Sequence, residues 1–274
     1  MNYRHAFHAG NFADVAKHLA LVSILTGLKR KPTPFAVIDT HAGRGLYELG
    51  GDEAVRGGEA ALGIERIRDL EGGSETLSLY LQLVRNQGPG RYPGSPLIAA
   101  KLLRGQDRLV AIEKHPEEFQ ALAAALAPFR RARVVEADGY ARLNALLPPQ
   151  ERRGLVLIDP PFEAPDEFAA AARAVGEALK RFATGIIVVW FPIKSPIAAD
   201  AFCGEVLAFG PRKALRLDIA VDTAPGRLGA AGLLVVNPPF GFARDMAASL
   251  EAVIPRLTRE KPARFELRTL AGEE

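Results

Sequence analysis

Four consecutive residues, Asp159, Pro160, Pro161 and Phe162, combine groups that can act on an amino nitrogen. They follow the apolar, β-prone run 155–158, so we expect a buried parallel strand to end at Asp159. In an open α/β sheet, ligands bind at the carboxyl ends of the strands. There, Asp159 and the rigidly held carbonyl of Pro160 could accept hydrogen bonds from an exocyclic amine while Phe162 stacks on the attached ring. A Pro-rich structural turn explains these residues equally well, and the rest of the chain must decide.

Three predicted strand ends that precede Asp159 carry residues suited to an adenosine-containing ligand. The first is followed by a turn at Gly43, the second ends at Glu113, and the third leads to Asp138 and Gly139. A glycine lets the backbone approach a ligand, and a strand-end acid accepts bonds from ribose hydroxyls. Asp138 could accept from an adenine amino group beside the small Gly139. Each has a structural explanation (a tight turn, a surface glutamate, a helix cap), but their order favours an adenosine lying across the sheet.

Two cofactors contain such an adenosine, NAD(P) and S-adenosylmethionine. The turn at Gly43 and Gly45 lacks the third glycine of the dinucleotide fingerprint, and a pyrophosphate usually needs the complete loop. A dehydrogenase also has no need of the residues 159–162. We therefore predict S-adenosylmethionine as the cofactor, with Asp159 beside it.

Strand and helix patterns alternate along the chain, which predicts a Rossmann-like α/β fold with a mainly parallel sheet. We expect strands at 35–39, 109–113, 133–136, 155–158 and 185–190, an antiparallel pair at 214–221 and 232–236, and a final strand at 264–267. We expect helices at 14–28, 96–103, 116–126, 166–182, 199–209 and 244–254, with a short helix that ends near residue 147.

The span 46–94 does not fit this alternation, because a βαβ unit normally enters its crossover helix within a few residues. It holds helical patterns at 58–70 and 74–85 with glycine-rich breaks between them. We predict a small inserted helical subdomain at 46–94, within a methyltransferase domain made of 1–45 and 95–274. Since the insertion follows the carboxyl end of a strand, it is a candidate for gripping the substrate.

Composition limits the class of protein. An apolar fraction of 48% supplies a core of ordinary size, and the single cysteine, Cys203, excludes an internal disulfide framework and indicates a reducing compartment. There is no apolar signal segment and no stretch of membrane-spanning length, so we expect a soluble, cytoplasmic protein. One cysteine and no His-x-x-x-His pair lead us to predict no metal site. The net charge of +3 is compatible with a nucleic-acid partner, and we expect a monomer.

Several segments together resemble a known family. Class I methyltransferases that act on amino nitrogens share the Asp/Asn-Pro-Pro-aromatic motif. The opening YRHAFHAGNFADVAKH at 3–18 is more specific, and with segments 39–43, 92–96, 137–139 and 153–162 it resembles the bacterial 23S rRNA adenine-N6 methyltransferase J family. The similarity covers nearly the whole chain, and that family carries an inserted helical piece at the same point. It implies a class I methyltransferase fold and methyl transfer to N6 of an adenine in 23S rRNA (position 2030), with the RNA free or in early assembly.

The resemblance also implies roles for individual residues. Lys17, His18 and His41 match contacts to the methionine end of the cofactor, the lysine as a charge for a carboxylate and the imidazoles as donors. Ser95, expected at the N-cap of the crossover helix, matches another cofactor contact, and Tyr3 matches a residue placed against the substrate RNA. The predicted catalytic residues are Asp159, Pro160 and Phe162, where many relatives have Tyr in place of Phe162. The predicted cofactor-binding residues are Lys17, His18, His41, Gly43, Ser95, Glu113, Asp138, Gly139 and Asp159.

A second copy of the tetrapeptide, Asn237-Pro238-Pro239-Phe240, follows another apolar run. Its motif is as good as the first, but it ends a strand near the C-terminus, at the expected antiparallel edge. The catalytic motif belongs at the fourth strand after the glycine turn, which is where Asp159 lies. We therefore predict that Asn237 forms a structural turn.

Other functions share parts of this pattern. An amino-group methyltransferase could act on another RNA, on DNA or on a protein glutamine. A nicotinamide-dependent oxidoreductase would be stabilised by NAD(P), and a catalytically silent RNA-binding protein would bind RNA without any cofactor.

Overall fold

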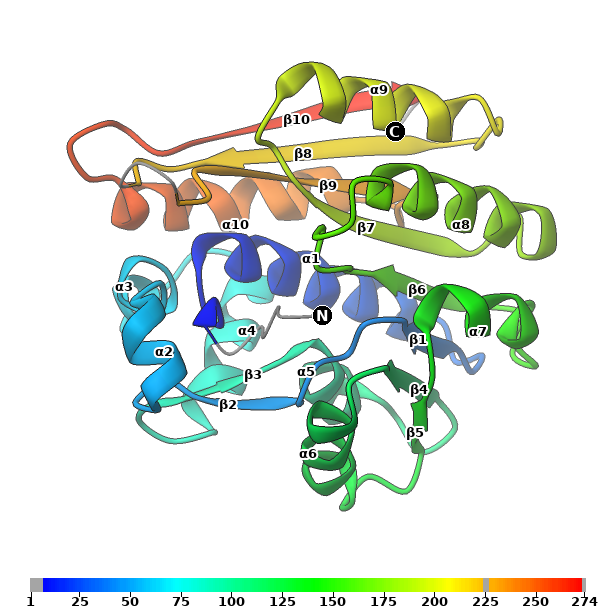
Figure 1. The fold of residues 1–274 in the computed structure, drawn as a ribbon, viewed down its shortest axis with the longest axis horizontal. Helices are drawn as coiled ribbons and strands as arrows, with labels where there is room; N and C mark the ends of the chain where they lie inside the picture. Colours follow the sequence, from blue (N-terminus) through cyan, green and yellow to red (C-terminus); the bar gives the residue numbers. More distant parts are fainter. Residues whose placement is uncertain (1–6, 224–226, 273–274) are drawn as a thin grey trace.

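The computed structural model describes residues 7–223 and 227–272, which form an eight-stranded mixed sheet with helices on both faces (Figure 1). Across the sheet the strand order is β10-β8-β9-β7-β6-β1-β4-β5. The expected Rossmann-like α/β fold is therefore confirmed. The strands of this sheet are β1 (Ala36–Asp39), β4 (Arg108–Glu113), β5 (Ala132–Glu136), β6 (Gly154–Ile158), β7 (Ile186–Pro192), β8 (Ala214–Ala220), β9 (Ala230–Val236) and β10 (Arg264–Ala271).

The strands β5, β4, β1, β6 and β7 run parallel. Strands β1 and β6 are buried along their whole length, and for this reason β6 appears in the sequence as a continuous apolar run. From β1 the chain moves outwards through β4 to β5 and returns to the other side of β1 with β6. The strand order thus reverses between β1, which ends at Asp39, and β6, which Asp159 follows. Such a reversal opens a crevice at the carboxyl ends of the strands.

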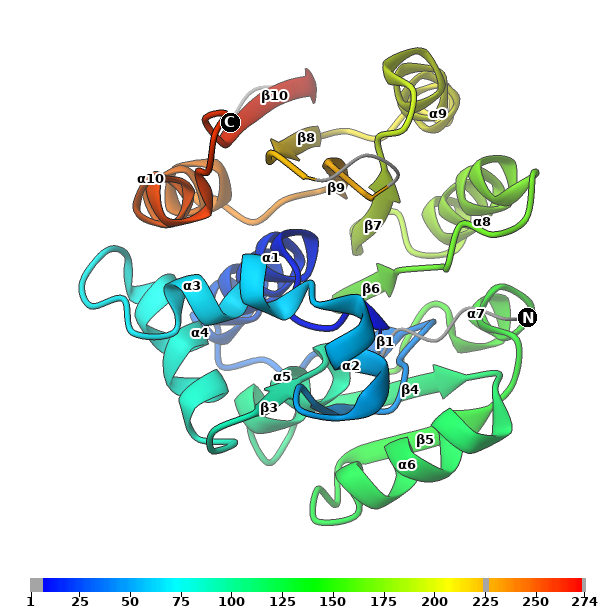
Figure 2. The ribbon, with the colours of Figure 1, turned by 60° about the vertical axis from the view of Figure 1, so that its left-hand side comes forward.

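Helices cover the sheet in two layers, and Figure 2 shows α1 and α10 across the sheet from α8 and α9. Helix α1 is buried on nearly every side, because it lies between the sheet and the helices α4 and α10. Asn11 caps α1, its side chain accepting from the Asp14 N–H at 2.8 Å. The helices outside the insertion are α1 (Phe12–Lys29), α5 (Ser95–Leu102), α6 (Pro116–Leu126), α7 (Gly139–Leu146), α8 (Glu167–Arg181), α9 (Pro196–Leu207) and α10 (Phe242–Leu257).

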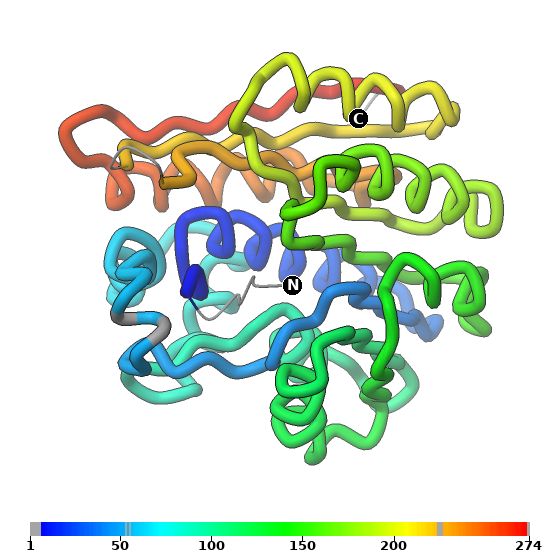
Figure 3. The backbone as a smooth tube through the Cα atoms, in the orientation of Figure 1, coloured from blue at the N-terminus to red at the C-terminus, as the bar shows by residue number. Residues whose placement is uncertain are grey.

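Residues 46–93 leave the sheet after β1 and return to it at α5 (Figure 3). The helix predicted at 74–85 is confirmed, whereas the helix predicted at 58–70 is replaced by a 3₁₀ helix at 60–62 and a short α-helix at 64–67, and 52–57 forms a helix that was not predicted. Two strands also pair antiparallel, which three-residue segments could not reveal by periodicity. Helix α4 packs on α1 and α10, so this segment contributes to the burial of α1. The division into a subdomain at 46–94 and a domain made of 1–45 and 95–274 stays a prediction. The elements are β2 (Leu46–Glu48), α2 (Asp52–Gly57), the 3₁₀ helix η2 (Ala60–Leu62), α3 (Ile64–Ile67), α4 (Glu75–Arg85) and β3 (Arg91–Pro93).

The predicted antiparallel pair is confirmed by β8 and β9, whose register runs from Ala214 opposite Val236 to Ala220 opposite Ala230. The final strand continues to Ala271, beyond the predicted end, because it pairs along the whole of β8. Among the helices in the described part of the chain, none has the length and apolar character required to cross a membrane.

The second tetrapeptide lies at the opposite end of the strands from the crevice, where the parallel strands begin. Strand β9 is antiparallel to β7, so Asn237, which follows β9, lies near the start of β7. Its side-chain amide donates to the carbonyls of Ala183 (3.0 Å) and Gly185 (2.8 Å). In this copy Asn237 has a positive φ of 52°, whereas in the first copy Phe162 has the positive φ, 50°. The two similar tetrapeptides therefore fold differently, and the prediction that Asn237 forms a structural turn is confirmed.

Replacing Asn237 tests this structural role. Asn237→Ala removes two hydrogen bonds and places a Cβ-bearing residue without a compensating side-chain bond at a positive φ. We expect the free energy of unfolding, measured with urea, to fall by about 2–3 kcal/mol. Asn237→Gly tolerates the backbone conformation and should lose less, which separates strain from hydrogen bonding. An Ala variant as stable as the wild type would contradict the assignment.

Candidate active site

Nine of the predicted residues line one cavity of about 370 Å³ at the carboxyl ends of β1, β4 and β6. This volume is in the range of small-molecule sites. Pro161 also lines the cavity, whereas Pro160 and Phe162 do not. Tyr3 lies outside the described residues. The nine residues are Lys17, His18, His41, Gly43, Ser95, Glu113, Asp138, Gly139 and Asp159.

A buried lysine connects α1 to the end of β6. The Lys17 ammonium donates to Asp14 Oδ1 at 2.8 Å and to Asp159 Oδ2, and the Lys17 side chain is only 5% exposed. Burial by itself would lower the pKa of Lys17, but the two carboxylates hold that pKa well above its usual value. Lys17 is therefore a permanent cation. Two of its three N–H groups are used by the protein, which leaves one for the ligand carboxylate that the resemblance implies.

The end of β1 holds a second buried carboxylate, Asp39. Its Oδ2 accepts from Ser95 Oγ at 2.7 Å, and its Oδ1 has no hydrogen-bond partner within the described residues. Burial raises the pKa of Asp39 to about 7, against the hydrogen bond from Ser95. The expectation that Ser95 is the N-cap was wrong: Gly94 has the extended backbone of the cap, and Ser95 is the first helical residue. The Ser95 hydroxyl donates to Asp39 and does not cap the helix.

The protonation of His41 follows from its neighbours. Thr40 Oγ1 donates to the carbonyl of Leu157 at 2.9 Å, so its lone pairs face His41 Nδ1 at 2.8 Å. Nδ1 must then carry the hydrogen, and Nε2 is an acceptor. Burial lowers the pKa of His41 to about 4, so the ring is neutral at physiological pH. An acceptor at Nε2 differs from the donor role expected for this imidazole, and it suits an ammonium or amino group of a ligand.

His18 lies deeper, in a chain of buried polar rings. Its Nδ1 is 2.6 Å from Tyr92 Oη, which is 2.9 Å from Tyr80 Oη. Burial raises the pKa of Tyr92 well above its usual value, so the phenol stays protonated. The bond to Tyr92, which Tyr80 in turn holds, orients the His18 ring at the cavity wall.

Glu113 is held by the backbone of the two turns beside it. Its Oε2 accepts from the Gly43 N–H at 2.8 Å and its Oε1 accepts from the His115 N–H at 2.7 Å. Each carboxylate oxygen has a further lone pair, so these bonds orient Glu113 without exhausting it. The alternative interpretation of Glu113 as a surface residue is wrong, because Glu113 is only 9% exposed.

Asp138 caps α7, as the structural alternative proposed, and also lines the cavity. Its Oδ1 accepts from the Ala141 N–H at 3.1 Å and its Oδ2 from Lys114 Nζ at 3.0 Å. Burial would raise the pKa of Asp138, but these two donors lower it below its usual value. A Cβ at Gly139 would lie 2.0 Å from the Thr40 carbonyl oxygen. Glycine is thus required here by the approach of the backbone after β1, whatever the ligand.

The charges of the cavity favour a cationic ligand that contains an adenosine over a dinucleotide. Six carboxylates and two lysines line it, and Arg44 neutralises one of the carboxylates, Glu118, through bonds of 2.9 and 2.6 Å. The remaining excess of negative charge would repel a pyrophosphate. A ligand carrying a sulfonium and an ammonium would be attracted. The residues present therefore fit S-adenosylmethionine: Glu113 and Asp138 offer acceptors for its hydroxyl and amino groups, and Lys17 offers a donor for its carboxylate. The six carboxylates belong to Glu113, Glu118, Asp138, Asp159, Glu163 and Glu167, and the lysines are Lys17 and Lys114.

The tetrapeptide at Asp159 bends sharply at its end. Phe162 has a φ of 50°, which is unfavourable for a residue with a large side chain and costs about 1–3 kcal/mol. Its ring packs against Phe168 and Trp190, with centroids 4.8 and 5.7 Å apart. The ring therefore lies beside the cavity, packed on protein, and stacking on a substrate would require it to turn.

Two residues of the site were not predicted from the sequence: Tyr140, which lines the cavity, and Asp14, which pairs with Lys17. Tyr140 Oη donates to Glu167 Oε1 at 2.9 Å, and the Tyr140 ring meets His41 edge-on at 4.9 Å between centroids. Tyr140 directly follows Gly139, a neighbourhood that could have drawn attention to it. Asp14 had no such signal, because an acid in the first turn of a helix is ordinary. In the described part of the chain no three His, Cys, Asp or Glu side chains cluster as metal ligands would.

Comparison with known proteins gives a consistent result. The model of the family "Ribosomal RNA large subunit methyltransferase D, RlmJ" matches residues 32–266. The chain is 43% identical over 252 residues to ribosomal RNA large subunit methyltransferase J of Escherichia coli K12, with 90% of each chain covered. It is 38% identical over 266 residues to the Haemophilus influenzae protein of that name, covering 94% of this chain and 93% of that one. A crystal structure of protein LPL1258 from Legionella pneumophila is 30% identical, with a TM-score of 0.89 over 97% of this chain and 99% of that one.

The raised pKa of Asp39 predicts a pH dependence of stability. The folded protein holds this proton more tightly than the unfolded chain, so stability from Asp39 is present below pH 4 and is lost as pH rises from about 4 to 7. Between pH 5.5 and 8.5 the wild type should lose on the order of 2 kcal/mol relative to Asp39→Asn, which cannot ionise. Urea unfolding of both proteins at the two pH values measures this difference. Parallel pH profiles would show that Asp39 does not titrate in this window.

Proposed function

The chain belongs to the ribosomal RNA large subunit methyltransferase J family, and on this premise we propose that it transfers a methyl group from S-adenosylmethionine to the exocyclic N6 of an adenine in 23S rRNA. The observation that carries the proposal is the shared cavity. The carboxylate of Asp159 borders the same space as Glu113 and Asp138, at the point where the strand order reverses. By the resemblance, the target is the adenine at position 2030.

The chain's own groups bind and orient the cofactor. When bound, S-adenosylmethionine supplies an electrophilic methyl group on a sulfonium. Glu113, fixed by two backbone N–H groups, accepts from the ribose hydroxyls, and Asp138 accepts from the adenine amino group. The remaining N–H of Lys17 donates to the ligand carboxylate, and Nε2 of the neutral His41 accepts from its ammonium. The excess of carboxylates around the cavity favours the sulfonium.

Asp159 holds and activates the attacking amine. Its Oδ2 is paired with Lys17, and its side chain is 14% exposed, so Oδ1 is available to accept an N6 hydrogen. The Pro160 carbonyl, on a stiff backbone, accepts the other. These two bonds localise the nitrogen lone pair that is otherwise delocalised into the ring. Positioning of this kind contributes on the order of 7–11 kcal/mol, and Asp159 is the nearest acceptor for the proton that the product must lose.

Phe162 replaces the stacking that the target base loses when it leaves the RNA. Unstacking costs a few kcal/mol. The strained backbone at Phe162 and the aromatic neighbours Phe168 and Trp190 give this ring a resting place beside the cavity. Turning towards the base would exchange the contacts with Phe168 and Trp190 for stacking on the base. The hydroxyl that a tyrosine would add is not needed for this role.

Substitution of Asp159 tests the proposed chemistry. Asp159→Ala should abolish transfer of labelled methyl to unmodified 23S rRNA while S-adenosylmethionine affinity stays within a few-fold, because Glu113 and Asp138 hold the cofactor. Asn237→Ala is the matched control and should retain activity while folded. Nucleoside analysis of the product should give N6-methyladenine. Label in another RNA, in DNA or in a protein glutamine, or activity lost with Asn237→Ala but not Asp159→Ala, would contradict the proposal.

The role of Phe162 predicts a graded response. Stacking of a base on an aromatic side chain is worth about 1–3 kcal/mol, so Phe162→Ala should lower kcat/KM for RNA by roughly 5- to 150-fold. Phe162→Tyr keeps the ring and should stay within about threefold of the wild type. Steady-state kinetics on an rRNA fragment measure both. Equal losses in the two variants would mean that the ring does not stack on the target.

A further inference from the structure

The second tetrapeptide exposes an aromatic ring to solvent at the end of the strands remote from Asp159. Asn237 anchors the turn to the carbonyls of Ala183 and Gly185, and Pro238 and Pro239 stiffen it. Phe240 follows and is 84% exposed, the most exposed large apolar side chain among the described residues. A single exposed apolar residue needs no explanation, so its surroundings decide whether this one has a role.

Those surroundings are basic. A cavity of about 180 Å³ beside Phe240 is lined by Lys213 and Arg244, with no acidic side chain among the lining residues. The Arg30 guanidinium reaches the Phe240 carbonyl at 3.5 Å, and the Asn237 N–H donates to the Lys213 carbonyl at 2.9 Å. The end of α1, the start of β8 and the start of α10 therefore converge on this turn.

Three of the segments that build the surface carry basic residues and no acidic ones, while the fourth, the end of β10, contributes Thr269 and Ala271 and is followed in the sequence by Glu273 and Glu274. Segments 26–34, 210–215 and 237–244 contain six lysines and arginines and no aspartate or glutamate. The neighbouring acid, Asp245, accepts from Ser23 and Thr76 and so is directed to the interior. Arg30, Lys213 and Arg244 are all exposed. The six basic residues are Lys29, Arg30, Lys31, Arg212, Lys213 and Arg244.

We propose that this basic aromatic face, formed by Arg30, Lys213, Phe240 and Arg244, is a second contact surface for single-stranded RNA. Phe240 stacks on one unpaired base, and the three cations neutralise the phosphates that flank it. Positive charge beside an exposed ring is the arrangement by which proteins hold single strands with little sequence preference. A protein partner or a second copy of this chain would have no comparable need for three exposed cations around one exposed ring.

The position of the face determines what it contributes. Strand β7 separates it from the carboxyl edge of the sheet by roughly 17 Å, at about 3.3 Å per residue, so it cannot touch the base that meets Asp159. It holds RNA remote from the target and acts on substrate affinity, leaving the chemical step unchanged. This inference rests on the proposed function, since it takes the same rRNA as the ligand.

The test compares a long 23S rRNA fragment with a short hairpin that carries only the target region. For the long fragment, Phe240→Ala should raise KM about tenfold with kcat unchanged, while KM for the hairpin stays the same. Phe240→Trp keeps a ring and should retain the wild-type KM. Arg30→Gln combined with Lys213→Gln should weaken binding and lower the salt dependence of log K by roughly 0.7 for each removed charge.

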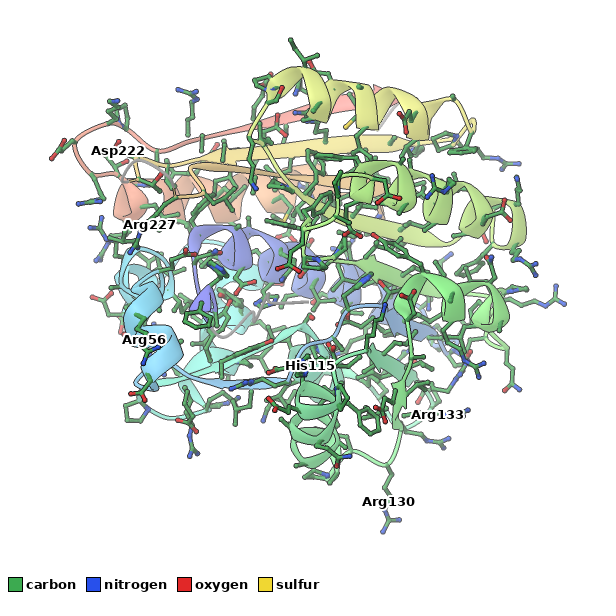
Figure 4. The ribbon with its side chains drawn as sticks, in the orientation of Figure 1. Arg56, His115, Arg130, Arg133, Asp222 and Arg227 are labelled. Carbon is green, nitrogen blue, oxygen red and sulfur yellow. The ribbon has the colours of Figure 1, made fainter. Side chains whose placement is uncertain are left out.

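Arg130→Gln is the matched charge control, because Arg130 follows α6 at the other end of the sheet and extends away from the body of the protein (Figure 4). It should change KM less than Phe240→Ala does, and it should change the salt slope less than the combined Arg30→Gln and Lys213→Gln substitutions do. An unchanged KM of Phe240→Ala on the long fragment, with an active wild type, would overturn the inference. So would a shift from dimer to monomer in Phe240→Ala without loss of RNA affinity, which would identify a protein interface. A wild type that methylates no rRNA would instead overturn the proposed function.

Discussion

A buried lysine between two carboxylates ties the first helix of this chain to the end of β6. Lys17 is almost fully enclosed, so the desolvation of three charges must be offset by their mutual attraction, and removing one partner of such a group typically costs 3–5 kcal/mol. Because Lys17 is carried by α1, the orientation of Asp159 depends on how α1 packs. That packing depends in turn on α4 from the insertion and on α10. The inserted segment is thereby linked to the Asp159 carboxylate through the packing of α1.

The cavity gathers more negative charge than its two lysines balance, and the protein reduces the resulting repulsion in several ways. Burial favours the protonated form of Asp39, and backbone N–H groups stabilise Glu113. His41 does not contribute, because burial keeps its ring neutral. The remaining imbalance is relieved when a cation enters. The same electrostatics favour a cationic ligand, such as the sulfonium of the proposed cofactor, over a pyrophosphate.

Two nearly identical tetrapeptides lie at opposite ends of the strands of the sheet. At Asp159 the strand is parallel to its neighbours, the first side chain borders the crevice, and the bend comes at Phe162. At Asn237 the strand is antiparallel, the bend comes at the first residue, and the amide clamps the start of β7. Strand direction thus places the first residue of one copy at the cavity and the final ring of the other copy on the surface. The surroundings of such a motif therefore depend on the direction of the strand that it follows.

Local pattern in the sequence determined the alternation of strands and helices, the apolar run that ends at Asp159 and the cap at Asp138, because each depends on residues close together in the chain. The structural turn at Asn237 followed from the order of the strands, because its local motif equals that at Asp159. Local pattern also predicted that Gly43, Glu113, Asp138, Gly139 and Asp159 follow strand ends, whereas the family resemblance supplied Lys17, His18, His41 and Ser95. Tertiary structure alone decided that Lys17 pairs with Asp159, 142 residues away, that Thr40 sets the tautomer of His41, and that Phe162 rests on Trp190. Those outcomes depend on burial and on contacts between distant segments, which no local periodicity encodes.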